Sequence, residues 1–113
     1  NNNTSYIFRL PELRSIDDKY GKPVNIQLHI GKIPVLVAGN SDGDLQMLEY
    51  ASDNNPKGKS LEILVHHDDP EREYSYDKRA ENVLKEAKSQ NWNIVSMKND
   101  FVDIFPINKT GLK

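Results

Sequence analysis

The sequence predicts an α/β domain built on a mainly parallel sheet. Strand-like apolar runs alternate with segments of helical periodicity, and each buried run ends in a polar turn. No internal repeat or low-complexity stretch interrupts the 113 residues, and they suffice for one domain with its own core. Because parallel strands end at a common edge, the polar turns that follow them should meet there, where ligands bind in open α/β sheets.

The first elements lie in the N-terminal third of the chain. Aromatic and β-branched residues predict a strand over 5–10. In the segment 24–30 apolar and polar residues alternate, and this alternation alone favours a second strand. Pro23 suits the first turn of a helix, however, and Gly31 suits the position just after one. The local residues therefore point in two directions for this segment.

The remaining elements alternate regularly. The clearest helix carries apolar residues at i, i+3, i+4 and i+7 between Ala80 and Ala87. Trp92, which follows it, is expected in the core. The expected elements are a strand over 33–38, a helix over 44–52, a strand over 61–65, a helix over 77–90 and a strand over 92–97.

The turn after the strand 33–38 is the main candidate for a functional site. It gathers Asn40, Ser41, Asp42 and Asp44 at the expected carboxyl edge of the sheet. Two carboxylates and an amide favour a hard cation, with Mg²⁺ as the first choice. The alternative is a purely structural turn that caps the next helix, since Asn, Ser and Asp are all good capping residues.

Two other motifs with similar spacing do not fit the turn. An EF-hand loop requires Gly at its sixth position and Glu at its twelfth, where this chain has Leu45 and Ala51. A nucleophile motif of the Asp-x-Asp-x-Thr kind requires Thr where this chain has Gln46.

Composition excludes several classes of partner. The formal net charge is −2 and the basic residues are dispersed, so the electrostatic footprint of a nucleic-acid-binding protein is missing. The chain has no cysteine, which excludes disulfides and thiolate metal sites. No apolar run approaches the roughly 18–20 residues needed to span a bilayer, so no membrane span is expected.

Four segments, taken in order, resemble the haloacid dehalogenase-like (HAD) phosphatases. The stretch GNSDGDLQML (39–48) resembles the fourth motif of that family, Gly-Asp-x-x-x-Asp-x-x-Met-Leu. The stretch GKP (21–23), followed by Ile26, resembles the third motif, a lysine that opens a helix. The stretches LVHHDDPEREYSYD (64–77) and WNIVSMK (92–98) resemble segments of one bacterial subgroup. The resemblance extends from about residue 7 to residue 106.

This resemblance implies a Rossmann-like, HAD-type three-layer sandwich in which 24–30 is a helix and 5–10 is one strand of an antiparallel hairpin. It also implies that residues 1–113 form a single partial domain, the C-terminal portion of a longer enzyme. The nucleophilic Asp, an acid/base Asp and a Ser/Thr motif would lie in the missing N-terminal part of the same protein, and the substrate-selecting cap is absent. Exported relatives in the subgroup favour an extracytoplasmic location.

The resemblance also assigns roles to residues. Lys22 would be catalytic and would bind the substrate phosphate together with Ser41. Asp44 would bind Mg²⁺ with Asn40 and Asp42, although the family usually has Asp at the position of Asn40. The activity implied is hydrolysis of a small phosphorylated substrate through an aspartyl-phosphate. The 113-residue chain alone is expected to be inactive, because it lacks the nucleophile.

Other polar residues have simpler interpretations. His66 and His67 are expected at the rim of the site and not as a metal pair, because neighbours in a strand point to opposite faces. Glu71, Arg72 and Glu73 are expected to form a solvated, self-paired charge run. The alternative function for the whole chain is a non-enzymatic, receiver-like module that binds a cation or a protein partner at the same edge.

Overall fold

The computed structural model describes residues 5–8, 11–13 and 15–105, and its core is a parallel sheet of three strands. The strands are β1 (Leu36–Gly39), β2 (Leu61–His66) and β3 (Asn93–Ser96), and they lie in the order β1-β2-β3. Their register places Val37 beside Glu62 and Leu64 beside Ile94. The expected α/β class with a parallel sheet is confirmed.

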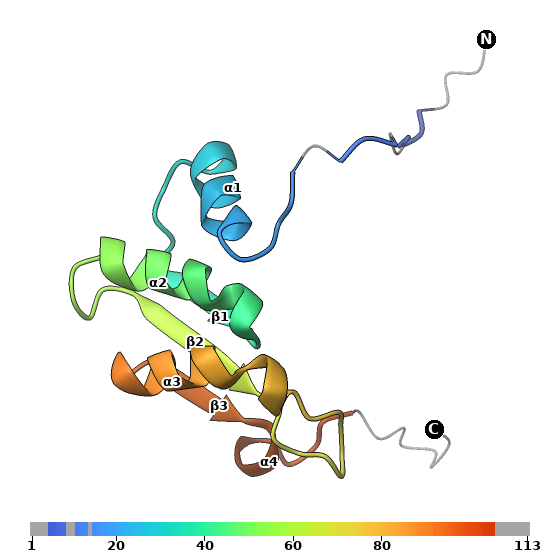
Figure 1. The fold of residues 1–113 in the computed structure, drawn as a ribbon, viewed down its shortest axis with the longest axis vertical. Helices are drawn as coiled ribbons and strands as arrows, with labels where there is room; N and C mark the ends of the chain where they lie inside the picture. The colour runs from blue at the N-terminus through green and yellow to red at the C-terminus, as the bar shows by residue number, and fades with distance from the viewer. Residues whose placement is uncertain (1–4, 9–10, 14, 106–113) are drawn as a thin grey trace.

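The described residues also form four helices and two short 3₁₀ turns. The helices are α1 (Gly21–His29), α2 (Leu45–Asn54), α3 (Glu81–Ser89) and α4 (Met97–Asp100), and the 3₁₀ turns are η1 (Asp42–Asp44) and η2 (Asp77–Arg79). Of these helices, α2 and α3 cover one face of the sheet (Figure 1). In the described part of the chain, none of the helices has the length and apolar character that a bilayer crossing requires.

The core lies between the sheet and the helices α2 and α3. Leu48 from α2, Leu64 from β2 and Val83 from α3 are completely buried in one cluster, so both helices pack on the same face of the sheet. Two crossovers of the same hand that step in the same direction produce this arrangement. Trp92 is 7% exposed and belongs to the same cluster, as expected from the sequence.

The segment 24–30 is helical, because α1 begins at Gly21 and ends at His29. Gly31 follows with φ of +68°, a left-handed conformation that glycine adopts without steric cost. The alternation of apolar residues is therefore not a strand signal here. The helix buries none of its residues within the described part of the chain, and its Leu28 is 74% exposed.

The strand expected over 5–10 is not formed by residues 5–8, while residues 9–10 lie outside the described residues. Tyr6, Ile7 and Phe8 are between 73% and 102% exposed. A strand requires a neighbour for its backbone hydrogen bonds, and no other described segment lies beside these residues in the sheet. The prediction was wrong for residues 5–8, because propensity alone does not supply that neighbour.

Candidate functional site

The acidic turn folds back onto the end of β1. Asp44 packs so closely against Gly39 that a Cβ atom at position 39 would lie 2.4 Å from the Cβ of Asp44. The backbone N–H groups of Asn40 and Ser41 donate hydrogen bonds to Asp44 Oδ2, at 2.9 Å and 3.3 Å. Glycine at the end of the strand is therefore required for the Asp44 carboxylate to reach these two donors.

Lys22 reaches the same carboxylate from the start of α1. Its ammonium group donates to Asp44 Oδ1, forming an ion pair between residues 22 positions apart. The Asp44 side chain is 7% exposed and that of Lys22 is 27% exposed. The structure thus brings together Lys22 and Asp44, to which the resemblance assigns the catalytic and metal-binding roles.

Each partner keeps the other charged. The hydrogen bond and the negative charge of Asp44 raise the pKa of Lys22 above its ordinary value, against the opposing effect of burial. Burial alone would raise the pKa of Asp44, but the Lys22 ammonium and the two backbone N–H groups outweigh it and lower that pKa. A fixed ammonium–carboxylate pair is therefore present throughout the neutral pH range.

A cavity of about 620 Å³ opens beside this pair, and residues of α1, β1 and α2 line it. Lys22 and Asp44 form part of its polar lining, and Ile26, Ile30 and Met47 form part of its apolar lining. The cavity also includes Ala38 of β1, which is an edge strand of the described sheet. The ion pair consequently lies next to open space.

Asp42 faces a different element from Asp44. Its two carboxylate oxygens accept hydrogen bonds from the Asn82 side chain at 2.7 Å and from the Val83 backbone N–H at 2.8 Å. These donors belong to the first turn of α3, where backbone N–H groups lack partners within the helix. The carboxylate thus caps α3, whereas that of Asp44 binds Lys22 and the backbone of the turn.

Asn40 and Ser41 line a small pocket of about 140 Å³ together with Tyr76 and Arg79. Asn40 donates from Nδ2 to His67 Nε2 at 3.3 Å, so its side chain points toward the end of β2. The structure therefore places His67 beside the acidic turn.

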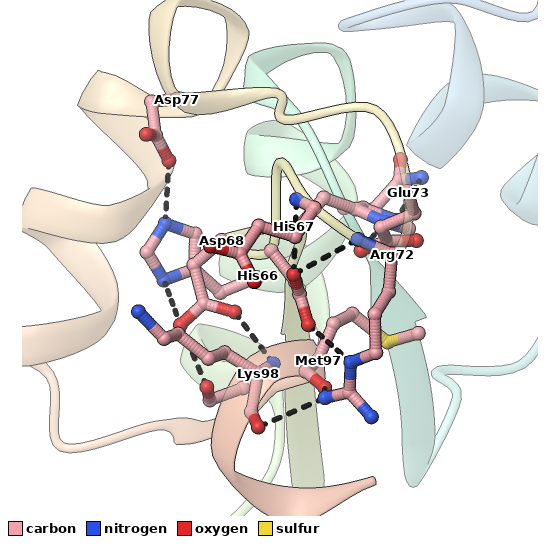
Figure 2. A network of polar contacts seen from close by, with 12 residues as sticks. His66, His67, Asp68, Arg72, Glu73, Asp77, Met97 and Lys98 are labelled. Carbon is pink, nitrogen blue, oxygen red and sulfur yellow. Dashed lines mark hydrogen bonds and ion pairs between the residues drawn. The ribbon is translucent and has the colours of Figure 1, made fainter. Parts of the chain in front are cut away.

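The two histidines have different surroundings, although β2 ends at His66 and His67 lies just beyond the strand. His67 Nδ1 lies 2.9 Å from Glu73 Oε1, whereas His66 Nε2 lies 2.9 Å from Asp77 Oδ1 (Figure 2). His66 Nδ1 is also 3.7 Å from a carboxylate oxygen of Asp68. Only His67 therefore contacts the acidic turn.

The charged run 71–73 is not the self-paired, solvated segment expected from the sequence. Arg72 pairs with Asp69 through Nε, and its two terminal nitrogens donate to four backbone carbonyls. Two of these carbonyls belong to Met97 and Lys98, as Figure 2 shows. Glu73 is 11% exposed at its side chain and binds His67. Sequence reasoning missed Glu73 because its partner is a neighbour in space, six residues earlier.

The acidic turn offers some of the oxygen atoms that a magnesium ion would need. Asp44 Oδ1 binds Lys22 and Asp44 Oδ2 accepts from two backbone N–H groups. Both oxygens of Asp42 bind α3, and among the described residues no donor contacts Asn40 Oδ1. Across residues 5–8, 11–13 and 15–105, no three His, Cys, Asp or Glu side chains converge as a metal site would require. Asp44 and Asn40 would contribute oxygens to such a site, and further ligands would have to come from elsewhere.

No protein-family model matches this chain, and no curated protein matches it.

Proposed function

We propose that this chain supplies the lysine and acidic-turn half of a magnesium-dependent phosphohydrolase that works through an aspartyl-phosphate intermediate. The observation that carries the proposal is the Lys22–Asp44 ion pair at the carboxyl end of a parallel strand, beside an open cavity. Ligands of open α/β sheets bind at that edge.

The difficulty of this reaction is electrostatic, because a carboxylate nucleophile must approach a dianionic phosphate. Lys22 reduces that repulsion with a full positive charge near the start of α1, where the helix dipole adds a partial positive charge. Asp44 holds the ammonium in place and keeps it protonated. A positive charge fixed before the reaction needs no reorganisation when negative charge develops on the phosphate.

Asp44 and the side-chain oxygen of Asn40 are the proposed contributors to the metal site, while Asp42 has a structural role as the cap of α3. Mg²⁺, when bound, would neutralise phosphate charge as a Lewis acid. Ser41 keeps its proposed role near the phosphate as the neighbour of Asn40 in the acidic turn, and its backbone N–H binds Asp44.

The nucleophile would come from the N-terminal part of the same protein, next to β1. The cavity beside Lys22 and Asp44 and the edge position of β1 support this place for it. Exposed apolar side chains there, among them Val35 and Leu36 at 61% each, are suited to burial by an additional segment.

The test compares the 113-residue chain with the longer protein that carries the nucleophile. We expect the longer protein to hydrolyse a chromogenic phosphate ester only when Mg²⁺ is present, and the 113-residue chain to release no product. In the longer protein, Lys22→Ala and Asp44→Asn should each lower kcat by about 10²-fold or more.

Lys85→Ala is a matched control, because Lys85 is an exposed lysine on α3. Its kcat should stay close to that of the parent protein. Turnover by the 113-residue chain alone would refute the proposal that the nucleophile lies outside it. Normal kcat values for both site variants would refute the assignment of Lys22 and Asp44 to the site.

A further inference from the structure

A series of hydrogen bonds through Asn40, His67 and Glu73 joins the end of β1 to the loop after β2. Glu73 Oε1 lies 2.9 Å from His67 Nδ1, and His67 Nε2 lies 3.3 Å from Asn40 Nδ2. The side chains of His67 and Glu73 are 18% and 11% exposed, so water has limited access to these hydrogen bonds. The backbone N–H of Asn40 also donates to Asp44, which connects the three residues to the Lys22–Asp44 pair.

The donors and acceptors of these groups determine which atom donates in each hydrogen bond. A carboxylate oxygen of Glu73 accepts a hydrogen bond, so the His67 tautomer with its hydrogen on Nδ1 fits this contact. His67 Nε2 then offers a lone pair that accepts a hydrogen bond. The Asn40 amide can donate to it through its NH₂ group but not through its oxygen. The amide of Asn40 is thereby held in one of its two orientations, and Oδ1 remains available as an acceptor.

The loop that carries His67 and Glu73 is itself anchored at both sides. Asp68 accepts from the Ser96 hydroxyl at 2.6 Å and from the Lys98 backbone N–H at 2.9 Å. Arg72 ties the loop to the carbonyls of the α4 segment, as Figure 2 shows. These contacts hold the imidazole and the carboxylate in position relative to the sheet.

We propose that His67 and Glu73 are positioning residues that orient the amide of Asn40, so that its oxygen is left free to accept at the acidic turn, whose backbone binds Asp44. A carboxylate at position 40 has no hydrogen to donate to His67 Nε2, so a His67 with its hydrogen on Nδ1 favours Asn over Asp at this position. The orientation follows from the contacts themselves, whereas the use of the oxygen in phosphate chemistry rests on the proposed function. Groups that orient a functional side chain from behind typically change activity or metal affinity by about 10–100-fold when they are removed.

The first test measures the orientation directly in the 113-residue chain by NMR. The ¹⁵N shifts of His67 should show hydrogen on Nδ1, and the Asn40 NH₂ resonances should be shifted from their solvent-exposed values. Hydrogen on Nε2 would overturn the proposal, because the Asn40 NH₂ group could not then donate to that nitrogen.

Substitutions at position 67 separate orientation from packing. In His67→Gln the new NH₂ group can donate to Glu73 and the new oxygen can accept from Asn40, so the Asn40 NH₂ resonances should stay shifted. His67→Leu fills similar space without either hydrogen bond and should move those resonances toward solvent-exposed values. His66→Gln, the matched control, should leave them in place. Equal effects of His67→Gln and His67→Leu would overturn the proposal.

The second test uses kinetics of the longer protein. His67→Leu should lower kcat/KM by about 10–100-fold, and His67→Gln should recover most of that loss. In an Asn40→Ala background, His67→Leu should cause no further loss, because its effect passes through Asn40. A full, additive loss in that background would overturn the proposal. Absence of any phosphatase activity would defeat the proposed function instead, while the NMR measurement would still decide the orientation.

Discussion

Replacing Lys22 by Met should destabilise the fold through the carboxylate that it leaves behind. Asp44 is 7% exposed at its side chain and, among the described residues, would keep the Asn40 and Ser41 backbone donors. A hydrogen bond to a charged group contributes about 1.5–3 kcal/mol. Because the Lys22 side chain is 27% exposed, solvent screening favours the low end of that range. We expect a loss of about 1–2 kcal/mol, or roughly 5–10 °C in Tm.

The pH dependence of this loss follows from the two pKa shifts. The lowered pKa of Asp44 stabilises the fold above about pH 4, and this contribution disappears as the pH falls through the folded-state pKa. The raised pKa of Lys22 stabilises the fold below about pH 10, and this contribution disappears as the pH rises through its folded-state pKa. The effect of Lys22→Met should therefore be constant between these limits and should shrink on either side of them.

Urea unfolding of the 113-residue chain at several pH values provides the assay, with Lys85→Met as the control. The reasoning would be refuted if the two variants were equally stable at pH 7. It would also be refuted if the difference between Lys22→Met and the parent chain persisted unchanged below the folded-state pKa of Asp44.

Three further predictions concern other contacts, and four substitutions test them. Asp42→Ala should cost about 1–2 kcal/mol by uncapping α3, and hydrogen exchange at the Val83 amide should accelerate; unchanged exchange would argue against the cap. Arg72→Lys should open the α4 segment to limited proteolysis, since an ammonium lacks the donor fork that binds several acceptors at once; unaltered cleavage would count against that tie. Leu64→Ala should cost about 2–5 kcal/mol, and Leu61→Ala, at a residue 43% exposed, under about 1 kcal/mol; calorimetry showing equal costs would contradict the assigned core.

Local sequence patterns predicted the central βαβ units well, because their signals are strong. The helix expected over 77–90 appears as η2 followed by α3, and the strand expected over 92–97 contains β3. The segment 24–30 was harder, since its alternating residues favoured a strand. There the Pro and Gly punctuation and the motif resemblance gave the correct helix, and the backbone confirms it.

Within the candidate site, the sequence indicated which residues take part but not which partner each of them contacts. Asp42 and Asp44 have the same side chain and lie two positions apart, so composition gave no reason to separate them. The close approach of Asp44 to Gly39 and the position of α3 separate them in the folded chain. Glu73 was assigned to solvent because its contact depends on a loop whose path is set by Asp68 and Arg72.

The edge position of β1 also affects how the chain behaves at high concentration. Apart from its pairing with β2, β1 has no other strand beside it in the described sheet, and its Leu36 is 61% exposed. An uncovered edge with apolar side chains is a template for pairing with a second molecule, which is the first step toward aggregation. The 113-residue chain should therefore self-associate as its concentration rises. A segment that covers β1 should reduce this self-association and raise the solubility of the chain.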